Sequence, residues 1–302
     1  LDLMWQRREK IHEDYRAWIE REPELSKGES ERPYLRLLLE ADLYRAKGQS
    51  WDLSVQDIRD TLNDATSGPA APLEAIYPSA HGITARQTSS LRRHEDFGLT
   101  WIIGRGLRCE IWIPINSVSA GDPDHLWADL GKYQHIDRFI TMLKAARASD
   151  SRILDLNQVF AILHAISNMY LKLLGKAGVN TETVHAKALL GGVWRTIPFL
   201  DAPTMLDRID QSGLPLCLID AAMVPSGTDA DSFLPIKLVG PFAPPNLHQM
   251  GCAFYLFELV CRAVGLQGIL ASHIEDEASA LLDELREAWG RSQPETEEQD
   301  DR

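Results

Sequence analysis

The period of the hydrophobic pattern changes along this chain, and that change limits the fold classes that the chain can adopt. Residues 156–174 place apolar side chains every three or four positions, as a helix with one buried face does. Residues 107–113 instead alternate, with apolar Cys109, Ile111 and Ile113 at every second position, as a strand with one buried face does. A chain that carries both patterns in separate segments belongs to the α+β class.

The first 66 residues are predicted to be helical. Residues 1–22 show a helical apolar stripe opposite a charged face, Pro33 is placed to open a second helix, and Ser54 is placed to cap a third. The last two helices, over 35–62, have the size of a helix-turn-helix, although acids outnumber bases here and an ordinary bundle is favoured. We therefore expect an N-terminal helical region at 1–66.

A change of composition follows. The run 67–72 is rich in Gly and Pro, and Pro78 and Gly82 continue the interruption, so residues 67–98 are predicted to be a linker. Two apolar runs then flank Gly104-Arg-Gly106, which predicts a β-hairpin over 99–113.

The remaining patterns predict an α+β body at 99–290 and a disordered acidic tail at 291–302. Overall we expect a predominantly helical α+β fold in which helices cover a small mixed or antiparallel sheet. Expected helices cover 203–211 and 247–264, and others start at Asp122-Pro123, after the cap Asp155, and at Ser272. The expected strands lie at 184–190, 193–199, 214–219 and 233–239.

Charge and composition limit the classes of partner. The net charge is −13, and the residues from Ile274 onward, with 11 acids and 3 bases, contribute −8 of it. No basic face is evident, which disfavours nucleic acid. The most apolar stretch, Met250 to Val264, contains Glu258 and Arg262, so it predicts a buried helix with an internal ion pair and no membrane span. Four cysteines without CxxC spacing suit free thiols in a cytoplasmic protein.

Carboxylates form the clearest candidate for chemistry. Asp201 and Asp220 each follow an apolar strand, and a Gly-rich loop carries Asp229 and Asp231. If the four converge, they bind a divalent cation, and the chain is a metal-dependent hydrolase or transferase. The favoured alternative makes Asp201 a helix cap and the loop residues solvated turn residues, so no metal is expected. If a metal binds, Asp229 and Asp231 are the expected ligands.

A second candidate is the dipeptide Trp194-Arg195. An Arg beside a Trp in a strand binds an anion or stacks on a ring. Because neighbouring side chains of a strand point to opposite faces, the alternative is that one is core and the other surface. With Asp201 and Asp220, these two are the candidate ligand-binding residues.

The function that these patterns favour is a non-catalytic regulatory or interaction region of a larger, bacterial-type intracellular protein. The chain begins at Leu1 without Met, no motif for nucleotide, metal or nucleophile chemistry occurs, and amphipathic helices stand at both ends. We expect no cofactor, no enzyme activity, and a protein partner or an upstream domain of the same chain. A second alternative is a nucleic-acid-associated protein, which would use the helix-turn-helix-like segment and a basic patch at Arg86, Arg92, Arg93, Arg105 and Arg108.

Overall fold

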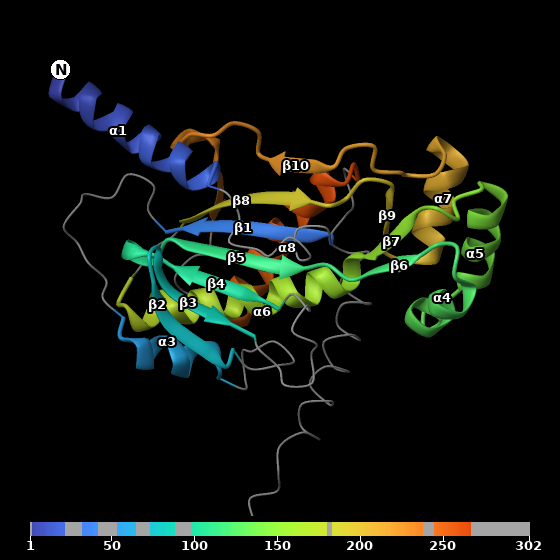
Figure 1. Cartoon of the computed structure of the whole chain (residues 1–302), viewed down its shortest axis with the longest axis horizontal. Helices are drawn as coiled ribbons and strands as arrows, with labels where there is room; N and C mark the ends of the chain where they lie inside the picture. Colours follow the sequence, from blue (N-terminus) through green and yellow to red (C-terminus); the bar gives the residue numbers. More distant parts are fainter. Residues whose placement is uncertain are drawn as a thin grey trace, which may run out of the picture.

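A large antiparallel sheet organises the molecule (Figure 1). The computed structural model describes residues 2–21, 32–41, 53–64, 73–87, 98–179, 183–237 and 245–266. The sheet has eight strands in the order β10-β8-β1-β5-β4-β3-β2, and β11 also pairs with β8. The strands are β1 (Tyr34–Glu40), β2 (Ala75–Ser79), β3 (Gly82–Arg86), β4 (Thr100–Ile103), β5 (Cys109–Pro114), β8 (Thr183–Gly191), β10 (Ala221–Val224) and β11 (Leu234–Lys237).

One face of this sheet carries the main apolar core. It packs against α6 (Leu156–Lys176), α8 (Pro245–Ala263) and α3 (Val55–Leu62). The long helix α6 begins where the Asp155 side chain accepts a hydrogen bond from the Asn157 amide. In the core, Phe160 of α6 lies 5.3 Å from Phe257 of α8 between ring centroids. Burial of these aromatic and aliphatic side chains holds the helical layer to the sheet.

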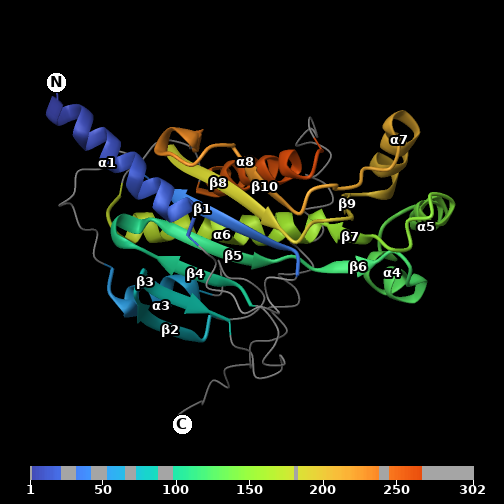
Figure 2. The same ribbon diagram turned by 45° about the horizontal axis from the view of Figure 1, so that its top comes forward.

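The opposite face of the sheet is covered at one end by α1 (Asp2–Ile19) and by a loop that contains the short helix η2 (Ala230–Ser232) (Figure 2). A separate small core forms there. Its buried members are Tyr15, Trp18, Ile19, Leu38, Ala230 and Phe233. The N-terminal end of α1 lies beyond the ends of the strands in both views.

A smaller three-stranded sheet lies at the other end of the molecule. Its strands β6 (Ser117–Ser119), β7 (Arg152–Asp155) and β9 (Thr196–Phe199) pack with α4 (Pro123–Leu130), α5 (Ile136–Ala145) and α7 (Ala202–Ser212). Strands β7 and β9 are parallel, whereas β6 and β7 are antiparallel. A short 3-10 helix, η1 (Arg105–Leu107), separates β4 from β5. None of the described helices is both long enough and apolar enough to span a bilayer.

The expectation of a predominantly helical fold with a small sheet is wrong. Helices take up 44% and strands 27% of the described residues, and the main sheet has eight strands, so the fold is a mixed α+β fold. The error begins at Pro33, where we predicted a helix and the structure has β1. Leucines at 35, 38 and 39 fit a helix, but those at 35, 37 and 39 equally fit a strand. Pairing with β5 on one side and β8 on the other selects the strand.

The predicted linker also contains regular structure. Strands β2 and β3 form a hairpin within 67–98. Gly82, with φ 137°, opens β3 against the Ile103 carbonyl, where a Cβ would clash. Pro78 lies in β2, which is an end strand of the sheet, where a missing amide donor is tolerated. Because β1 pairs with β5 and β8, the predicted N-terminal region shares one sheet with the predicted body.

Several local predictions are confirmed. The hairpin at 99–113 is β4 and β5, which pair antiparallel. Helices begin at the predicted caps Ser54, Asp122, Asp155 and Asp201. The strand predicted at 214–219 is displaced, because regular pairing begins at Ala221 in β10. The helix predicted from Ser272 and the acidic tail lie outside the described residues.

Candidate functional site at the junction of α1 and the large sheet

The carboxylate cluster that the metal-dependent alternative needs does not form among the described residues. Asp201 caps α7, where its Oδ1 accepts a hydrogen bond of 2.7 Å from the Thr204 amide. Asp220 is exposed, and Asp229 and Asp231 lie on the η2 loop beside α1. Within the described part of the chain, no group of three or more His, Cys, Asp or Glu side chains is placed to hold a metal ion. The four aspartates therefore do not meet in one cluster, and Asp201 is the helix cap that the favoured alternative expected.

The Trp194-Arg195 pair lies between the two sheets and does not join those carboxylates. Trp194 is 54% exposed. Arg195 adopts a left-handed backbone conformation with φ 56°, and its guanidinium lies 3.8 Å from the Asp150 carboxylate. Both side chains are thus accessible, and the expectation that one of them is core is wrong. Their ligand-binding role stays a prediction. The ion pair predicted between Glu258 and Arg262 is present on the surface of α8.

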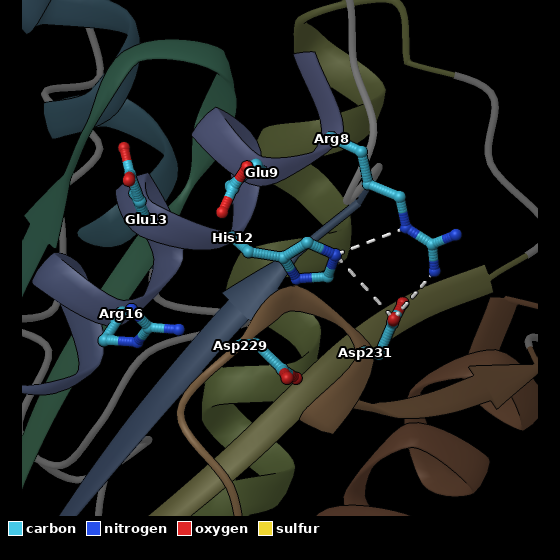
Figure 3. A pocket seen from close by; sticks show the side chains of 7 residues that line it. All are labelled: Arg8, Glu9, His12, Glu13, Arg16, Asp229 and Asp231. Carbon is cyan, nitrogen blue, oxygen red and sulfur yellow. Dashed lines mark hydrogen bonds and ion pairs between the residues drawn. The ribbon is translucent and has the colours of Figure 1, made fainter. Parts of the chain in front are cut away.

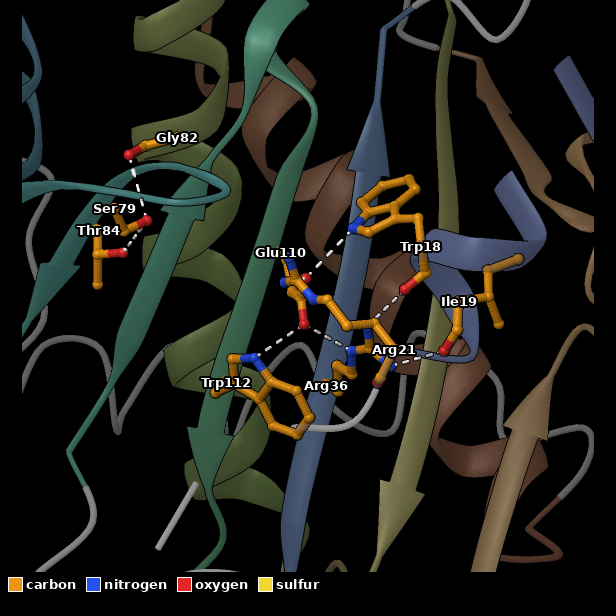
Figure 4. Close-up of polar contacts among 9 residues, drawn as sticks. All are labelled: Trp18, Ile19, Arg21, Arg36, Ser79, Gly82, Thr84, Glu110 and Trp112. Atoms are coloured by element: carbon orange, nitrogen blue, oxygen red, sulfur yellow. Dashed lines mark hydrogen bonds and ion pairs between the residues drawn. The ribbon is translucent and has the colours of Figure 1, made fainter. Parts of the chain in front are cut away.

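The polar groups that the fold does bring together lie beneath α1. Glu110 of β5 is only 2% exposed, yet its carboxylate accepts four hydrogen bonds (Figure 4). Arg36 donates from Nε at 2.8 Å, Trp112 from Nε1 at 3.0 Å and Trp18 from Nε1 at 3.2 Å. Arg21, which follows α1, also donates to this carboxylate. Glu110 thereby joins two strands to the end of the helix.

Arg36 also caps α1. Its two terminal guanidinium nitrogens donate to the carbonyls of Ile19 and Trp18, both at 2.8 Å. The last carbonyls of a helix lack partners within the helix and carry partial negative charge, so a cation there stabilises it. Burial lowers the pKa of Arg36 from its usual value, and the neighbouring Glu110 carboxylate opposes that effect. The buried charge is thus matched by an acid on one side and by helix carbonyls on the other.

A second buried acid repeats the arrangement one turn earlier on α1. Glu40 accepts a hydrogen bond of 2.7 Å from Arg108 and one of 3.2 Å from the Tyr15 hydroxyl. The Arg108 guanidinium lies over the rings of Tyr15, at 4.3 Å, and Trp18, at 4.8 Å. Burial and the Glu40 charge raise the pKa of Tyr15, so its hydroxyl remains a donor.

The η2 loop is fastened to the sheet by a buried lysine. Lys187 of β8 is inaccessible to solvent, and its Nζ donates to the carbonyls of Pro225 and Ser232 and to the Ser232 hydroxyl. Burial lowers the pKa of Lys187 to about 8, and Asp229 opposes that shift. The same loop positions Phe233, whose ring stacks on Trp18 at 5.8 Å with an interplanar angle of 16°.

A charged cavity of about 340 Å³ opens between α1 and this loop (Figure 3). All of its lining residues are ionisable. They are Arg8, Glu9, His12, Glu13, Arg16, Asp229 and Asp231. Asp231 bridges the two walls, with its carboxylate 3.0 Å from Arg8 and 3.8 Å from His12. Arg8, His12 and Arg16 are four residues apart, so they share one side of the helix.

This junction was missed in the sequence because its members are distant along the chain. The available signal was the polar half of the alternation in β5, namely Arg108, Glu110 and Trp112, which indicates a second packed layer when the strand is central. Chemically, the junction matches each buried charge with a partner and fixes a helix on a sheet. No family model, no curated protein and no solved structure matches this chain.

Proposed function

We propose that this chain is a non-catalytic regulatory or interaction module in which α1 makes the contact with a partner. The partner is another protein or a further domain of the same polypeptide. The observation that carries the proposal is the way α1 is held. Its last turn is fixed by buried charges, whereas residues 8–10, 13 and 14 are exposed and the helix runs beyond the strands (Figure 1).

The kind of attachment decides whether α1 is only held on the sheet or also oriented. A helix that only covers a sheet can be held by apolar contacts, which have little directional preference. Burying Glu110 and Arg36 costs desolvation energy that their pairing at best offsets. What such a network adds is direction, because the two carbonyl contacts from Arg36 are satisfied in one orientation of the helix. A fixed direction is useful when the free half of α1 has to present a surface.

The exposed side of α1 presents both signs of charge. Arg16 and the acids Glu9 and Glu13 are exposed along the cavity. Complementary charges across an interface mainly set specificity and association rate. A partner surface that places a carboxylate near Arg16 and a cation near the two glutamates fits this pattern.

The two alternative functions lack support in the described residues. A metal-dependent enzyme required the four aspartates to converge, and they do not. Nucleic-acid binding required a helix at 35–62, but residues 34–40 form β1. Arg108 of the expected basic patch is paired with Glu40, and Arg92 and Arg93 lie outside the described residues.

Site-specific photo-crosslinking tests the proposal. A photo-reactive residue in place of Glu13, in cells that make this protein naturally, is expected to yield one discrete adduct or one discrete intramolecular link. Reversing two neighbouring charges, with Glu9→Lys and Arg16→Glu, is expected to reduce that product at least fivefold.

The matched control is Asp129→Lys on α4, an exposed charge reversal at the other end of the molecule. It should leave the crosslinked product unchanged. Absence of any product, or equal loss with the control, would show that α1 is not the contact element.

A further inference from the structure

The charged cavity between α1 and the η2 loop contains side chains that have no charged partner in the described part of the chain (Figure 3). Arg8 and Asp231 pair with each other across it. By contrast, the side chains of Glu9, Glu13 and Arg16 form no ion pair or hydrogen bond with a described residue. The helix wall of the cavity thus offers one cation and two carboxylates to a bound molecule.

His12, on the same wall, adds a hydrogen-bond donor that is not used. Its Nε2 accepts a hydrogen bond of 3.4 Å from Nε of Arg8, so the neutral ring carries its proton on Nδ1. In the protonated ring Nδ1 is a donor as well. This atom is buried and has no hydrogen-bond partner among the described residues. A donor left unpaired in this way costs free energy, which an acceptor on a bound molecule would recover.

The opposite wall supplies a carboxylate from a loop that is itself held in place. The backbone carbonyl of Asp229 accepts hydrogen bonds from the Ser232 amide, at 3.1 Å, and from the Ser232 hydroxyl, at 2.6 Å. Lys187 fastens the same loop to β8. The Asp229 side chain, however, forms no hydrogen bond or ion pair with a described residue. Both walls are therefore ordered before a ligand arrives, which lowers the entropic cost of binding.

The size and the lining of the cavity indicate the class of ligand. Its volume of about 340 Å³ lies at the lower end of the range for small-molecule sites, roughly 300–1,000 Å³. Such sites are mostly lined by apolar side chains, whereas every lining residue here is ionisable, so the ligand must be charged. With the pair of Arg8 and Asp231 set aside, Arg16 and three carboxylates remain to be matched. A small molecule with one anionic group and more than one cationic group fits this balance.

We propose that the cavity between α1 and the η2 loop binds a basic α-amino acid. Its carboxylate pairs with the Arg16 guanidinium, whose planar fork suits that group, and accepts a hydrogen bond from His12. Its two cationic groups lie against Asp229 on one wall and against Glu9 and Glu13 on the other. The site shares residues with the contact surface proposed for α1, but it needs no partner protein, so either proposal can fail without the other.

Isothermal titration calorimetry of the full chain with L-lysine tests the proposal. Saturable binding of one molecule per chain is expected. Two lysine analogues probe the two kinds of charge without any substitution in the protein. They are 1,5-diaminopentane, which lacks the carboxylate, and L-norleucine, which lacks the side-chain amino group, and each is expected to bind at least fivefold more weakly than L-lysine.

Two substitutions then assign the charges of the ligand to the two walls. Arg16→Gln is expected to weaken L-lysine at least fivefold and to leave 1,5-diaminopentane within twofold, because only L-lysine carries the carboxylate. Asp229→Asn is expected to weaken both ligands at least fivefold. The matched control is Arg138→Gln, the same change at an exposed position of α5 at the other end of the molecule, and it should alter neither affinity.

The comparison of ligands on the native chain decides the proposal even if a variant fails to fold. No saturable heat with L-lysine would overturn it, and so would 1,5-diaminopentane or L-norleucine binding as tightly as L-lysine. With folded variants, as judged by an unchanged circular dichroism spectrum, an equal loss with Arg138→Gln or full affinity in Asp229→Asn would place the ligand elsewhere.

Discussion

The two faces of the large sheet are built from alternate residues of the same strands, yet different interactions hold the layers that cover them. In β1, Leu37 contacts the apolar layer under α6 and α8, while the next residue back, Arg36, points to α1 and is paired with Glu110. Both side chains are buried. The face that packs on α6 and α8, the helical face, is held mainly by shape and apolar burial. The face beneath α1 has a small apolar core and, in addition, hydrogen bonds between buried charged groups.

The difference shows what each face contributes. An apolar core stabilises in proportion to area and tolerates volume-conserving changes. A paired charge network contributes little net stability, but the loss of one partner leaves the other buried and unpaired. We therefore expect substitutions on the α1 face to have effects that depend strongly on the partner residue, and those on the helical face to be nearly independent of each other.

The largest expected effect is that of Glu110→Ala. It leaves the Arg36 guanidinium buried without its carboxylate and should lower the free energy of unfolding by about 3–5 kcal/mol. Urea denaturation measures the loss. A decrease below about 1 kcal/mol would mean that Arg36 finds solvent or another acid.

A double substitution separates the network's contribution to stability from its contribution to the orientation of α1. In the double variant Arg36→Met with Glu110→Leu, the buried Arg36 charge is gone and Arg21, whose side chain is 19% exposed, is the only charged group that loses a partner, so at least half of the lost stability should return. Amide hydrogen exchange in the last turn of α1 should nevertheless be faster than in the native chain, because its carbonyl caps are gone. Native exchange rates in that turn would show that the network does not orient the helix.

The second effect is a pH dependence from Lys187. Its pKa of about 8 is below the ordinary value of 10.5, so the unfolded chain binds more protons between these two pH values. The free energy of unfolding should therefore rise with pH in this window, by at most about 1.4 kcal/mol per pH unit. Lys187→Met should lack this rise. The test is the difference in unfolding free energy between native chain and variant at pH 7, 9 and 10, and a constant difference would refute it.

A smaller effect is expected on the helical face. Ile111 is fully buried in the main core, and Ile111→Val removes one methyl group from it. Such a change costs about 0.5–1.5 kcal/mol. Amide hydrogen exchange in α1 should speed up no more than the loss of overall stability accounts for. A selective acceleration in α1 would show that the two faces are coupled through the sheet.

The smallest effect is that of Arg8→Ala at the cavity. Arg8 and Asp231 are 62% and 50% exposed, and exposed ion pairs contribute less than about 1 kcal/mol. The difference from the native chain should shrink further when salt is raised from 50 mM to 500 mM. A loss comparable with that of Glu110→Ala would place the free half of α1 in the stabilising network.

Local signals in the sequence determined a good part of the secondary structure. Helix caps are read correctly because one short side chain bonds to an amide two or three residues later, as Ser54 does with Asp57. The hairpin of β4 and β5 is read correctly because its two runs are close in sequence and alternate clearly. Neither feature needs information from elsewhere in the chain.

Tertiary structure alone decided β1 and the candidate site. The leucines of 35–39 satisfy both periods, and the choice of strand rests on pairing with segments more than 60 residues away. The site likewise depends on long-range contacts, since Trp18 and Glu110 are 92 residues apart. A polar residue at an alternating position is read as solvent-facing unless a second layer is known to cover it. The sequence thus determined which residues share a face, whereas packing determined that the charged face of this sheet is buried beneath a helix.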